Sequence, residues 1–268
     1  MDSPFRARRL PQDRETAPVW EESAGLRWRY AFARAAETRA NNEMGQDCVV
    51  LAPAPEGFSF CVTDGVSQSF FGDIAAAALA DGLVQWLSEL EPGAEVEVVR
   101  ASLETRLREL CAEVSEDVRD QPLPAELPEM LRQVLEQKRL IGSESMYACG
   151  RIWRPAPGHP HGQLVLSWLG DVRCRSWWAG QEWKLEGFRT EDRWSSGRGI
   201  LGSPGLFVSS LDSPQGRLSR LAVYSDGLEI LDGLAQLPDN QSLGRAIADL
   251  ARNPKSDDVS LVEVELTD

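Results

Sequence analysis

Hydrophobic and polar positions alternate in three segments near the start of the chain, and this pattern predicts β-strands. The segments are LRWRYAFARA from residue 26, DCVVLA from residue 47 and FSFCVTD from residue 58, separated by turn-forming residues. Residues 1–22 mix Arg, Pro, Asp and Glu without a period. We therefore expect a flexible lead over residues 1–22, outside the core, and one folded domain over residues 23–268.

The spacing of apolar residues then changes to that of helices. A first helix is predicted after Gly72, with Asp73 placed to cap it, and two more near residues 95–117 and 128–140. The apolar residues of the third helix are expected to pack in the core; they are Met130, Leu131, Val134 and Leu135.

From residue 142 the period returns to two. SMYACGRIW, QLVLSWLG and DVRCRSWWAG predict successive strands of an antiparallel meander, and the Gly-, Ser- and Pro-rich residues 186–205 predict an irregular excursion from the sheet. GLFVSSL, RLAVYSDG and DVSLVEVEL predict three further strands, with the helical SLGRAIADLARN before the last. The total of nine or ten strands and four or five helices predicts an α+β layered sandwich.

Composition narrows the classes of function. Lys and Arg total 28 against 42 Asp and Glu, and this charge of −14 disfavours nucleic acid as a partner. No apolar run is long enough to span a bilayer and the start has no apolar signal core, so we expect a cytoplasmic protein that does not engage membranes. Five scattered cysteines predict buried free thiols, and the only histidines, His159 and His161, predict a hairpin tip and not a zinc site.

Aspartates occur where strands begin or end. Asp64 and Asp226 each end a predicted strand and are followed by Gly65 and Gly227, while Asp47 and Asp257 precede strands. Carboxylates that converge at sheet edges can hold Mg²⁺ or Mn²⁺, and glycine permits a tight turn and a close approach of the backbone. Taken singly, each aspartate would be interpreted as a turn former or a helix cap.

The order of these motifs resembles the PP2C-type family of metal-dependent serine/threonine phosphatases. In sequence order they are QDCVV, FCVTDG before a helix, SWLGDVR, LAVYSDG and SDDVSLVEV, and they cover about residues 25–268. The resemblance implies two packed, mostly antiparallel β-sheets, a β-sandwich, flanked by α-helices.

The resemblance also implies roles for single residues. Asp64 would bridge two metal ions and the Gly65 carbonyl would complete the shell of the second ion. Asp226 and Asp257 would supply further carboxylates, Asp47 would bind metal or orient metal-bound water, and Asp171 of GDVR would contribute to a weaker third ion.

The chemistry that follows is hydrolysis by a water shared between two Mg²⁺ or Mn²⁺ ions. The cations would lower the pKa of that water, offset the charge of the phosphoryl oxygens and overcome the acidity of the chain. The expected substrate is a phosphoserine or phosphothreonine protein, with a cognate kinase as a possible partner and the enzyme as a monomer.

Some positions depart from the family pattern. Gln46 stands where many members have glutamate, the usual phosphate-binding arginine position is Asn42 with Arg39 as its candidate replacement, and DGVSQS replaces a more glycine-rich loop. The alternative is therefore a catalytically impaired pseudophosphatase that binds phosphoproteins or regulates. A haloacid-dehalogenase site is disfavoured because Val66 stands where that class needs a second aspartate.

Overall fold

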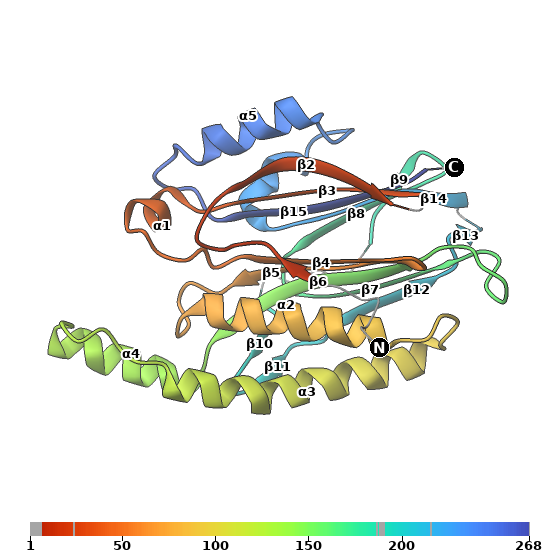
Figure 1. The fold of residues 1–268 in the computed structure, drawn as a ribbon. Coiled ribbons are helices and arrows are strands. Elements are labelled where there is room, and N and C mark those ends of the chain that lie inside the picture. Colours follow the sequence, from red (N-terminus) through yellow and green to blue (C-terminus); the bar gives the residue numbers. More distant parts are fainter. Residues whose placement is uncertain (1–6, 24, 186, 188–190, 215, 268) are drawn as a thin grey trace.

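Two stacked antiparallel β-sheets form the centre of the molecule, with helices on both outer faces (Figure 1). The computed structural model describes residues 7–267 except 24, 186, 188–190 and 215. The predicted fold class, two packed antiparallel sheets flanked by helices, is confirmed.

The first sheet has eight strands. Its main path runs β1-β4-β5-β6-β10-β11, and β7 pairs with β6 and with β12. The strands are β1 (Arg8–Arg9), β4 (Cys48–Ala54), β5 (Gly57–Gly65), β6 (Glu144–Trp153), β7 (Gln163–Leu169), β10 (Arg193–Ser195), β11 (Gly199–Leu201) and β12 (Gly205–Ser209). The central pair β5 and β6 is in continuous register over nine positions, which fixes the strand that ends in Asp64.

The second sheet has seven strands. Its main path runs β2-β3-β15-β14-β8-β9, and β13 pairs with β14. The strands are β2 (Thr16–Ser23), β3 (Leu26–Ala33), β8 (Arg173–Trp178), β9 (Gln181–Trp183), β13 (Asp212–Ser213), β14 (Gly216–Tyr224) and β15 (Val259–Leu266). The last strand of the chain therefore lies between β3, near the start, and β14.

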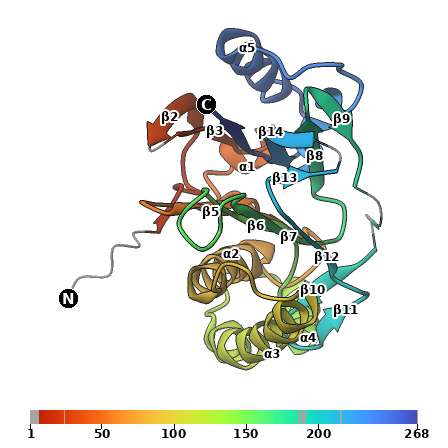
Figure 2. The same ribbon diagram turned by 90° about the vertical axis from the view of Figure 1, so that its right-hand side faces the viewer.

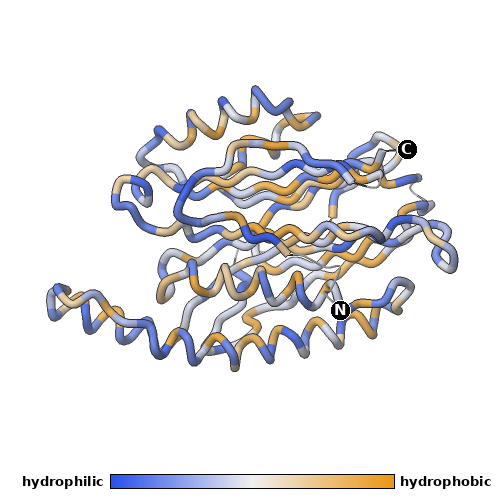
Figure 3. The backbone as a smooth tube through the Cα atoms, in the orientation of Figure 1, coloured by the Kyte–Doolittle hydropathy of each residue, from blue (hydrophilic) through white to orange (hydrophobic). Residues whose placement is uncertain are grey.

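The helices divide between the two outer faces. α2 (Gly72–Glu89) and α3 (Val96–Asp120) cover the first sheet, while the 3-10 helix (Asp226–Leu231) and α5 (Asn240–Leu250) cover the second (Figure 2). α1 (Ala36–Ala40) precedes β4, and α4 (Glu129–Ile141) precedes β6. Buried hydrophobic residues accordingly form three layers, one between the sheets and one under each group of helices. Hydrophobic positions run through the strands of both sheets, whereas the helices alternate hydrophobic and hydrophilic positions (Figure 3).

The prediction that residues 1–22 lie outside the core was wrong. β2 pairs with β3, β1 pairs with β4, and the intervening Leu10 and Gln12 are buried. Gln12 donates hydrogen bonds to the carbonyls of Gly45 and Asp47, both at 3.0 Å. A polar sequence can form such strands because edge strands need only one hydrogen-bonded neighbour and one buried face. Residues 1–6 lie outside the described residues.

The predicted meander of three strands after residue 142 was wrong at its last step. β6 pairs with β7, but β8 pairs with β14 and β9, so the turn at Gly170 and Asp171 carries the chain from the first sheet to the second. Gly170 has φ +95°, which only glycine adopts without strain. The meander and the change of sheet share one alternating pattern, so the sequence did not distinguish them.

The predicted excursion over residues 186–205 is also partly wrong. β10 pairs with β6 opposite Glu144 and Ser145, and β11 pairs with β10, so this segment extends the first sheet. Trp194 on β10 is fully buried and donates to the Leu107 carbonyl at 2.9 Å. Residues 186 and 188–190 of this segment lie outside the described residues.

The predicted packing of the third helix in the core was wrong for three of its four residues, and only Leu135 packs, partly buried, against the core. α4 contains no buried residue, and the side chains of Met130, Leu131 and Val134 are exposed by 79%, 45% and 44%. α3 lies against α2 and the first sheet with six buried residues, whereas α4 projects past the edge of the sheets (Figure 1). α4 therefore contributes only the partly buried Leu135 to the core under the first sheet.

Three smaller expectations have clear outcomes. All five cysteines are free thiols, and Cys48, Cys61 and Cys149 are buried. His159 and His161 lie in the connection between β6 and β7, as expected. Among the described residues, no helix is long and apolar enough to cross a bilayer.

Candidate metal centre

Asp64 lies at the end of the central strand β5, where the two sheets meet the start of α2. It pairs directly opposite Met146 of β6, so the two side chains share one face of the sheet. Met146 packs against the hydrophobic layer between the sheets, which places Asp64 at the end of that layer. Burial raises the pKa of Asp64 well above its ordinary value, and the negative charges of Asp47, Asp226, Asp257 and Asp171 raise it further.

Asp226 reaches the same place from the second sheet. It is the first residue of the 3-10 helix that follows β14, and its charge raises the pKa of Asp64, so the two carboxyl groups lie near one another. Burial raises its pKa, as do the charges of Asp257 and Asp171, while Arg173 and the contact with Asp64 lower it. Two adjoining carboxyl groups are stable only if a proton or a cation lies between them.

Asp171 approaches from the turn that links the sheets. Burial raises its pKa, the neighbouring Arg173 guanidinium lowers it, and the charge of Asp257 raises it. Arg173 lies 3.6 Å from the Asp171 carboxylate and 3.6 Å from that of Asp232, and it donates to the Asp171 carbonyl at 2.6 Å. One arginine thus offsets part of the negative charge on this side.

Asp257 and Asp258 precede β15 and differ in exposure. Asp257 is exposed and accepts a hydrogen bond from the Asp258 N–H at 2.8 Å. Its charge acts on the pKa of Asp47, Asp64, Asp171 and Asp226, so Asp257 lies among them.

Asp258 is a residue that we did not single out from the sequence. It is buried and accepts hydrogen bonds from the backbone N–H groups of Ala35, at 2.6 Å, and of Gln46. It therefore holds the segment that precedes β4 against the start of β15. The doubled aspartate in SDDVS was the available signal, because a second carboxylate beside a buried strand needs partners of its own.

Asp47 lies deeper than the other aspartates. It is 2% exposed and accepts a hydrogen bond from Ser260 Oγ at 2.7 Å. Burial raises its pKa well above the ordinary value, the charge of Asp258 adds to this, and hydrogen bonds from Ser225 and Ser260 oppose it. Asp47 directly precedes β4 of the first sheet, and a residue of the second sheet, Ser260, thus holds its side chain in place.

Glycine is needed at Gly65 and Gly227 because a side chain there would clash with neighbouring backbone, and not because the chain makes a tight turn. A Cβ on Gly65 would lie 2.7 Å from the Gln46 carbonyl oxygen, and one on Gly227 would lie 2.0 Å from that of Asp258. Neither has a positive φ, so the turn that we expected is not the reason for glycine. Each glycine lets the segment of one aspartate pack against the segment of another.

Two positions from the sequence lie apart from the main cluster or differ in role. Arg39 on α1 donates to the Ala251 carbonyl, and its charge lowers the pKa of Glu15; no interaction in the described residues joins it to the aspartates. Asp73 does not cap α2, because the N-cap residue is Phe71 and the Ile74 N–H donates to the Phe71 carbonyl at 3.0 Å. Burial raises the pKa of Asp73, and the charge of Asp258 raises it too.

The donor set fits a hard divalent cation by its chemistry. Within the described residues, no three His, Cys, Asp or Glu side chains converge closely enough to ligate one ion, so the aspartates form an electrostatic cluster and not a closed cage. Their donors are all carboxylate oxygens, which Mg²⁺ and Mn²⁺ prefer, and their raised pKa values indicate negative charge that little else offsets. A bound cation would relieve that repulsion.

Two cavities flank the cluster. One, of about 290 Å³, is lined by Asp171, Arg173 and Tyr224 among others. The other, of about 790 Å³, is lined by the loop after Gly65, Met146 and the end of α4. Asp171 thus borders the first cavity, and Met146, which pairs opposite Asp64, borders the second.

Comparisons with known proteins identify the fold. No protein-family model matches the sequence, and no curated protein matches it significantly. Among solved structures, the serine/threonine phosphatase Stp1 from Staphylococcus aureus is 13% identical, with 95% of this chain and 98% of Stp1 covered at a TM-score of 0.58. The catalytic domain of the serine/threonine phosphatase PstP in complex with two manganese ions is 19% identical, with 91% and 99% covered at a TM-score of 0.57.

A third similar structure is RsbX in complex with magnesium. It is 11% identical, with 93% of this chain and 100% of RsbX covered at a TM-score of 0.53. The likeness extends over nearly the whole length of each protein, and at these identities it shows a shared fold.

Proposed function

We propose that this protein is a metal-dependent phosphatase that hydrolyses phosphoserine and phosphothreonine in proteins. The observation that carries the proposal is the meeting of Asp64 and Asp226, from two different sheets, with Asp171 and Asp257 within electrostatic reach. This cluster occurs in a fold that serine/threonine phosphatases also have; one of them, PstP, was solved with two manganese ions, and RsbX, which has a similar fold, was solved with magnesium.

The aspartates would hold two Mg²⁺ or Mn²⁺ ions, and they would differ in which ion they contact. Asp64 would contact both ions, the Gly65 carbonyl would complete the shell of the second, and Asp226 and Asp257 would complete the shell of the first. Asp171 would serve a weaker third ion. When bound, such cations offset phosphoryl charge and activate water for attack on phosphorus.

Asp47 and Arg39 have different proposed tasks. Asp47 is buried, and Ser260 fixes its carboxylate, so it is suited to orient water near the ions and not to leave its place. Arg39 is proposed as a phosphate ligand; for this its guanidinium would leave the Ala251 carbonyl, and the exposure of that contact permits the movement. We further propose that the protein is a cytoplasmic monomer acting on the products of a serine/threonine kinase.

The test is hydrolysis of an aryl phosphate and of a phosphoserine peptide with Mn²⁺. We expect Asp64→Asn to lower kcat by about 10³-fold or more, because the substitution removes charge from the centre of the cluster. The matched control is Asp117→Asn, the same chemical change at an exposed position of α3, which should leave kcat unchanged.

Metal binding separates the main proposal from a pseudophosphatase. Calorimetry with Mn²⁺ should show two bound ions in the wild type and weaker binding in Asp64→Asn. Metal binding without turnover on either substrate would favour the non-catalytic alternative, and equal rates in wild type and Asp64→Asn would refute the proposed site.

A further inference from the structure

The larger of the two cavities is a groove that opens directly beside Asp64. Its near wall is the loop of residues 66–69, and the Val66 N–H donates to the Glu144 carbonyl at 2.9 Å. Met146, opposite Asp64, also lines it and contacts Gly170, the residue before Asp171. The groove therefore starts where the candidate metal centre ends.

The far wall of the groove carries an unusual arrangement of charge. Glu144 has a side chain only 6% exposed, and its two oxygens contact two arginines: Arg193 at 2.6 Å and Arg198. One buried carboxylate is thus shared by two guanidinium groups, which leaves positive charge in excess. The Arg198 side chain is 46% exposed, so that excess faces solvent along the groove.

Lys138 adds a second source of positive charge. It lies on α4, lines the same groove, and makes no ion pair within the described residues. The other carboxylate on the groove wall is Glu191, whose carbonyl accepts from Arg193. Three cationic side chains therefore face two carboxylates, one of them buried, on a protein whose overall charge is −14.

We propose that this groove binds the acidic peptide segment that flanks the phosphorylated residue of the substrate. A peptide whose phosphate lies at the aspartate cluster would have its neighbouring residues in the groove, where Arg198 and Lys138 attract Asp and Glu side chains. The exposed groove residues Ser67 and Gln68 offer polar groups for a peptide backbone. The inference rests on the proposed phosphatase function, because that function places the phosphate beside the groove.

The experiment compares two phosphoserine peptides, one with Asp and Glu around the phosphoserine and one with Asn and Gln in their place. Phosphonate analogues of both, which cannot be hydrolysed, are titrated in Mn²⁺ by fluorescence anisotropy, and the phosphorylated forms give kcat/KM. We expect the wild type to favour the acidic peptide, and the ratio to fall roughly two- to fivefold in Lys138→Gln and in Arg198→Gln, the size of one exposed ion pair. The preference should also shrink at high salt, because exposed charges are screened.

Three controls make the outcome decisive. Arg198→Lys keeps the charge and should retain most of the preference, and Arg252→Gln, at an exposed arginine that pairs with Asp249, should leave the ratio unchanged. Lys138→Gln removes no ion pair, so it remains informative if Arg198→Gln fails to fold. Equal binding of both peptides by the wild type, or an unchanged ratio in folded Lys138→Gln and Arg198→Gln, would overturn the inference.

Failure of the proposed function has a different signature. It would appear as absence of hydrolysis of the aryl phosphate and of both peptides, whereas the anisotropy ratio reports the groove whether or not turnover occurs.

Discussion

The aspartate cluster concentrates electrostatic repulsion at one end of the two sheets. Asp64 and Asp226 lie near one another, and burial together with neighbouring carboxylates raises the pKa of each. A folded protein retains such a cluster at a loss of stability, which a ligand of opposite charge can recover. Stability in the absence of metal is therefore a direct measure of the cluster.

We predict that Asp64→Asn stabilises the metal-free protein at pH 7.5 by about 1 kcal/mol, the ordinary size of a single-residue effect on stability. Because the folded pKa of Asp64 lies above its unfolded value, its contribution to stability is present at low pH and is lost as the pH rises through the folded pKa. The advantage of the variant should thus shrink as the pH falls toward the unfolded pKa of about 4.

The measurement is urea unfolding in EDTA between pH 5 and pH 7.5, repeated with Mn²⁺. With Mn²⁺ the order should reverse, since the wild type gains more binding free energy than the variant. A variant less stable than the wild type in EDTA at pH 7.5 would show that Asp64 does not lie in a repulsive cluster.

Sequence order predicts that aspartates at strand ends converge, but not how they are held. Asp64 lies at the end of β5, and Asp226 and Asp171 follow strands, which is the basis of that prediction. The contacts of Asp258 with Ala35 and Gln46 span more than 200 residues of sequence, and no local pattern encodes them. The roles of Gly65 and Gly227 likewise depend on segments that approach from elsewhere.

At the scale of elements, α3 and α4 show how periodicity differs from burial. Both helices carry apolar residues at helical spacing, yet α3 buries six residues and α4 buries none. Periodicity reports that a helix has an apolar face, and only the space left by other elements decides whether that face is covered. The short strands β10 and β11 escaped prediction because three residues are too few to show a period.

We predict that substitutions in the two helices differ sharply in their effect on stability. Leu107→Ala in α3 should destabilise the protein by about 2–4 kcal/mol, because Leu107 is fully buried and a cavity would remain. Met130→Ala in α4 should change the free energy of unfolding by about 0.5 kcal/mol or less, because that side chain is 79% exposed.

Urea unfolding of each variant gives both values, and circular dichroism controls for loss of helix. A loss of more than about 2 kcal/mol in Met130→Ala would indicate that α4 is packed after all.

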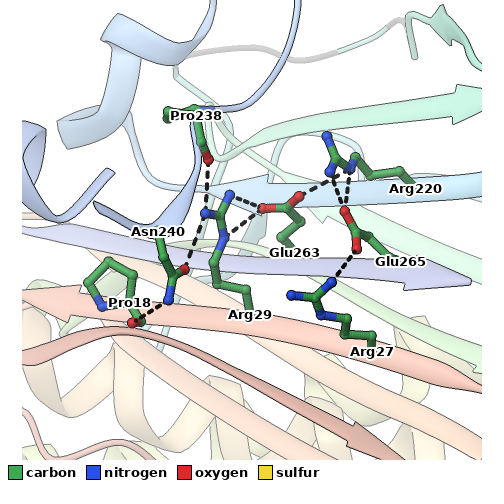
Figure 4. A network of polar contacts seen from close by, with 8 residues as sticks. All are labelled: Pro18, Arg27, Arg29, Arg220, Pro238, Asn240, Glu263 and Glu265. Atoms are coloured by element: carbon green, nitrogen blue, oxygen red, sulfur yellow. Dashed lines mark hydrogen bonds and ion pairs between the residues drawn. The ribbon is translucent and has the colours of Figure 1, made fainter. Parts of the chain in front are cut away.

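At the scale of the whole molecule, a buried ion network holds the second sheet to its covering helix. Arg29 on β3 is 2% exposed and pairs with Glu263 on β15, which is fully buried, while Arg220 on β14 lies 3.1 Å from the second oxygen of Glu263 (Figure 4). Arg29 also donates to the Pro238 carbonyl at 2.9 Å, just before α5. Asn240 of α5 donates in turn to the Pro18 carbonyl of β2 at 3.0 Å. The network thus joins five elements from both ends of the chain.

The overall architecture could be predicted from the sequence, whereas the ion network could not. Strand and helix order together indicated two sheets with helices outside, because consecutive elements with apolar faces have few ways to cover one another. The sequence around Arg29 alternates Arg with aromatic residues, which indicates a strand with one polar face but not that this face is covered by α5. Its pairing with Glu263, 234 positions later, is a product of the tertiary fold.

We predict that Glu263→Gln destabilises the protein by about 3 kcal/mol, because it leaves the buried Arg29 guanidinium without a carboxylate. Arg29→Met should be as harmful, since it leaves the Glu263 carboxylate beside Arg220 alone. The double variant Arg29→Met with Glu263→Gln should lose clearly less than the two single losses combined, because neither unpaired charge then remains in the interior. Urea unfolding of the four proteins gives the coupling free energy. The matched control is Arg27→Met, at a side chain 42% exposed, which should lose less than about 1 kcal/mol.

Strictly additive losses would mean that Arg29 and Glu263 stabilise the sheet independently. The network would then be a set of separate contacts and not the coupled unit that its geometry indicates.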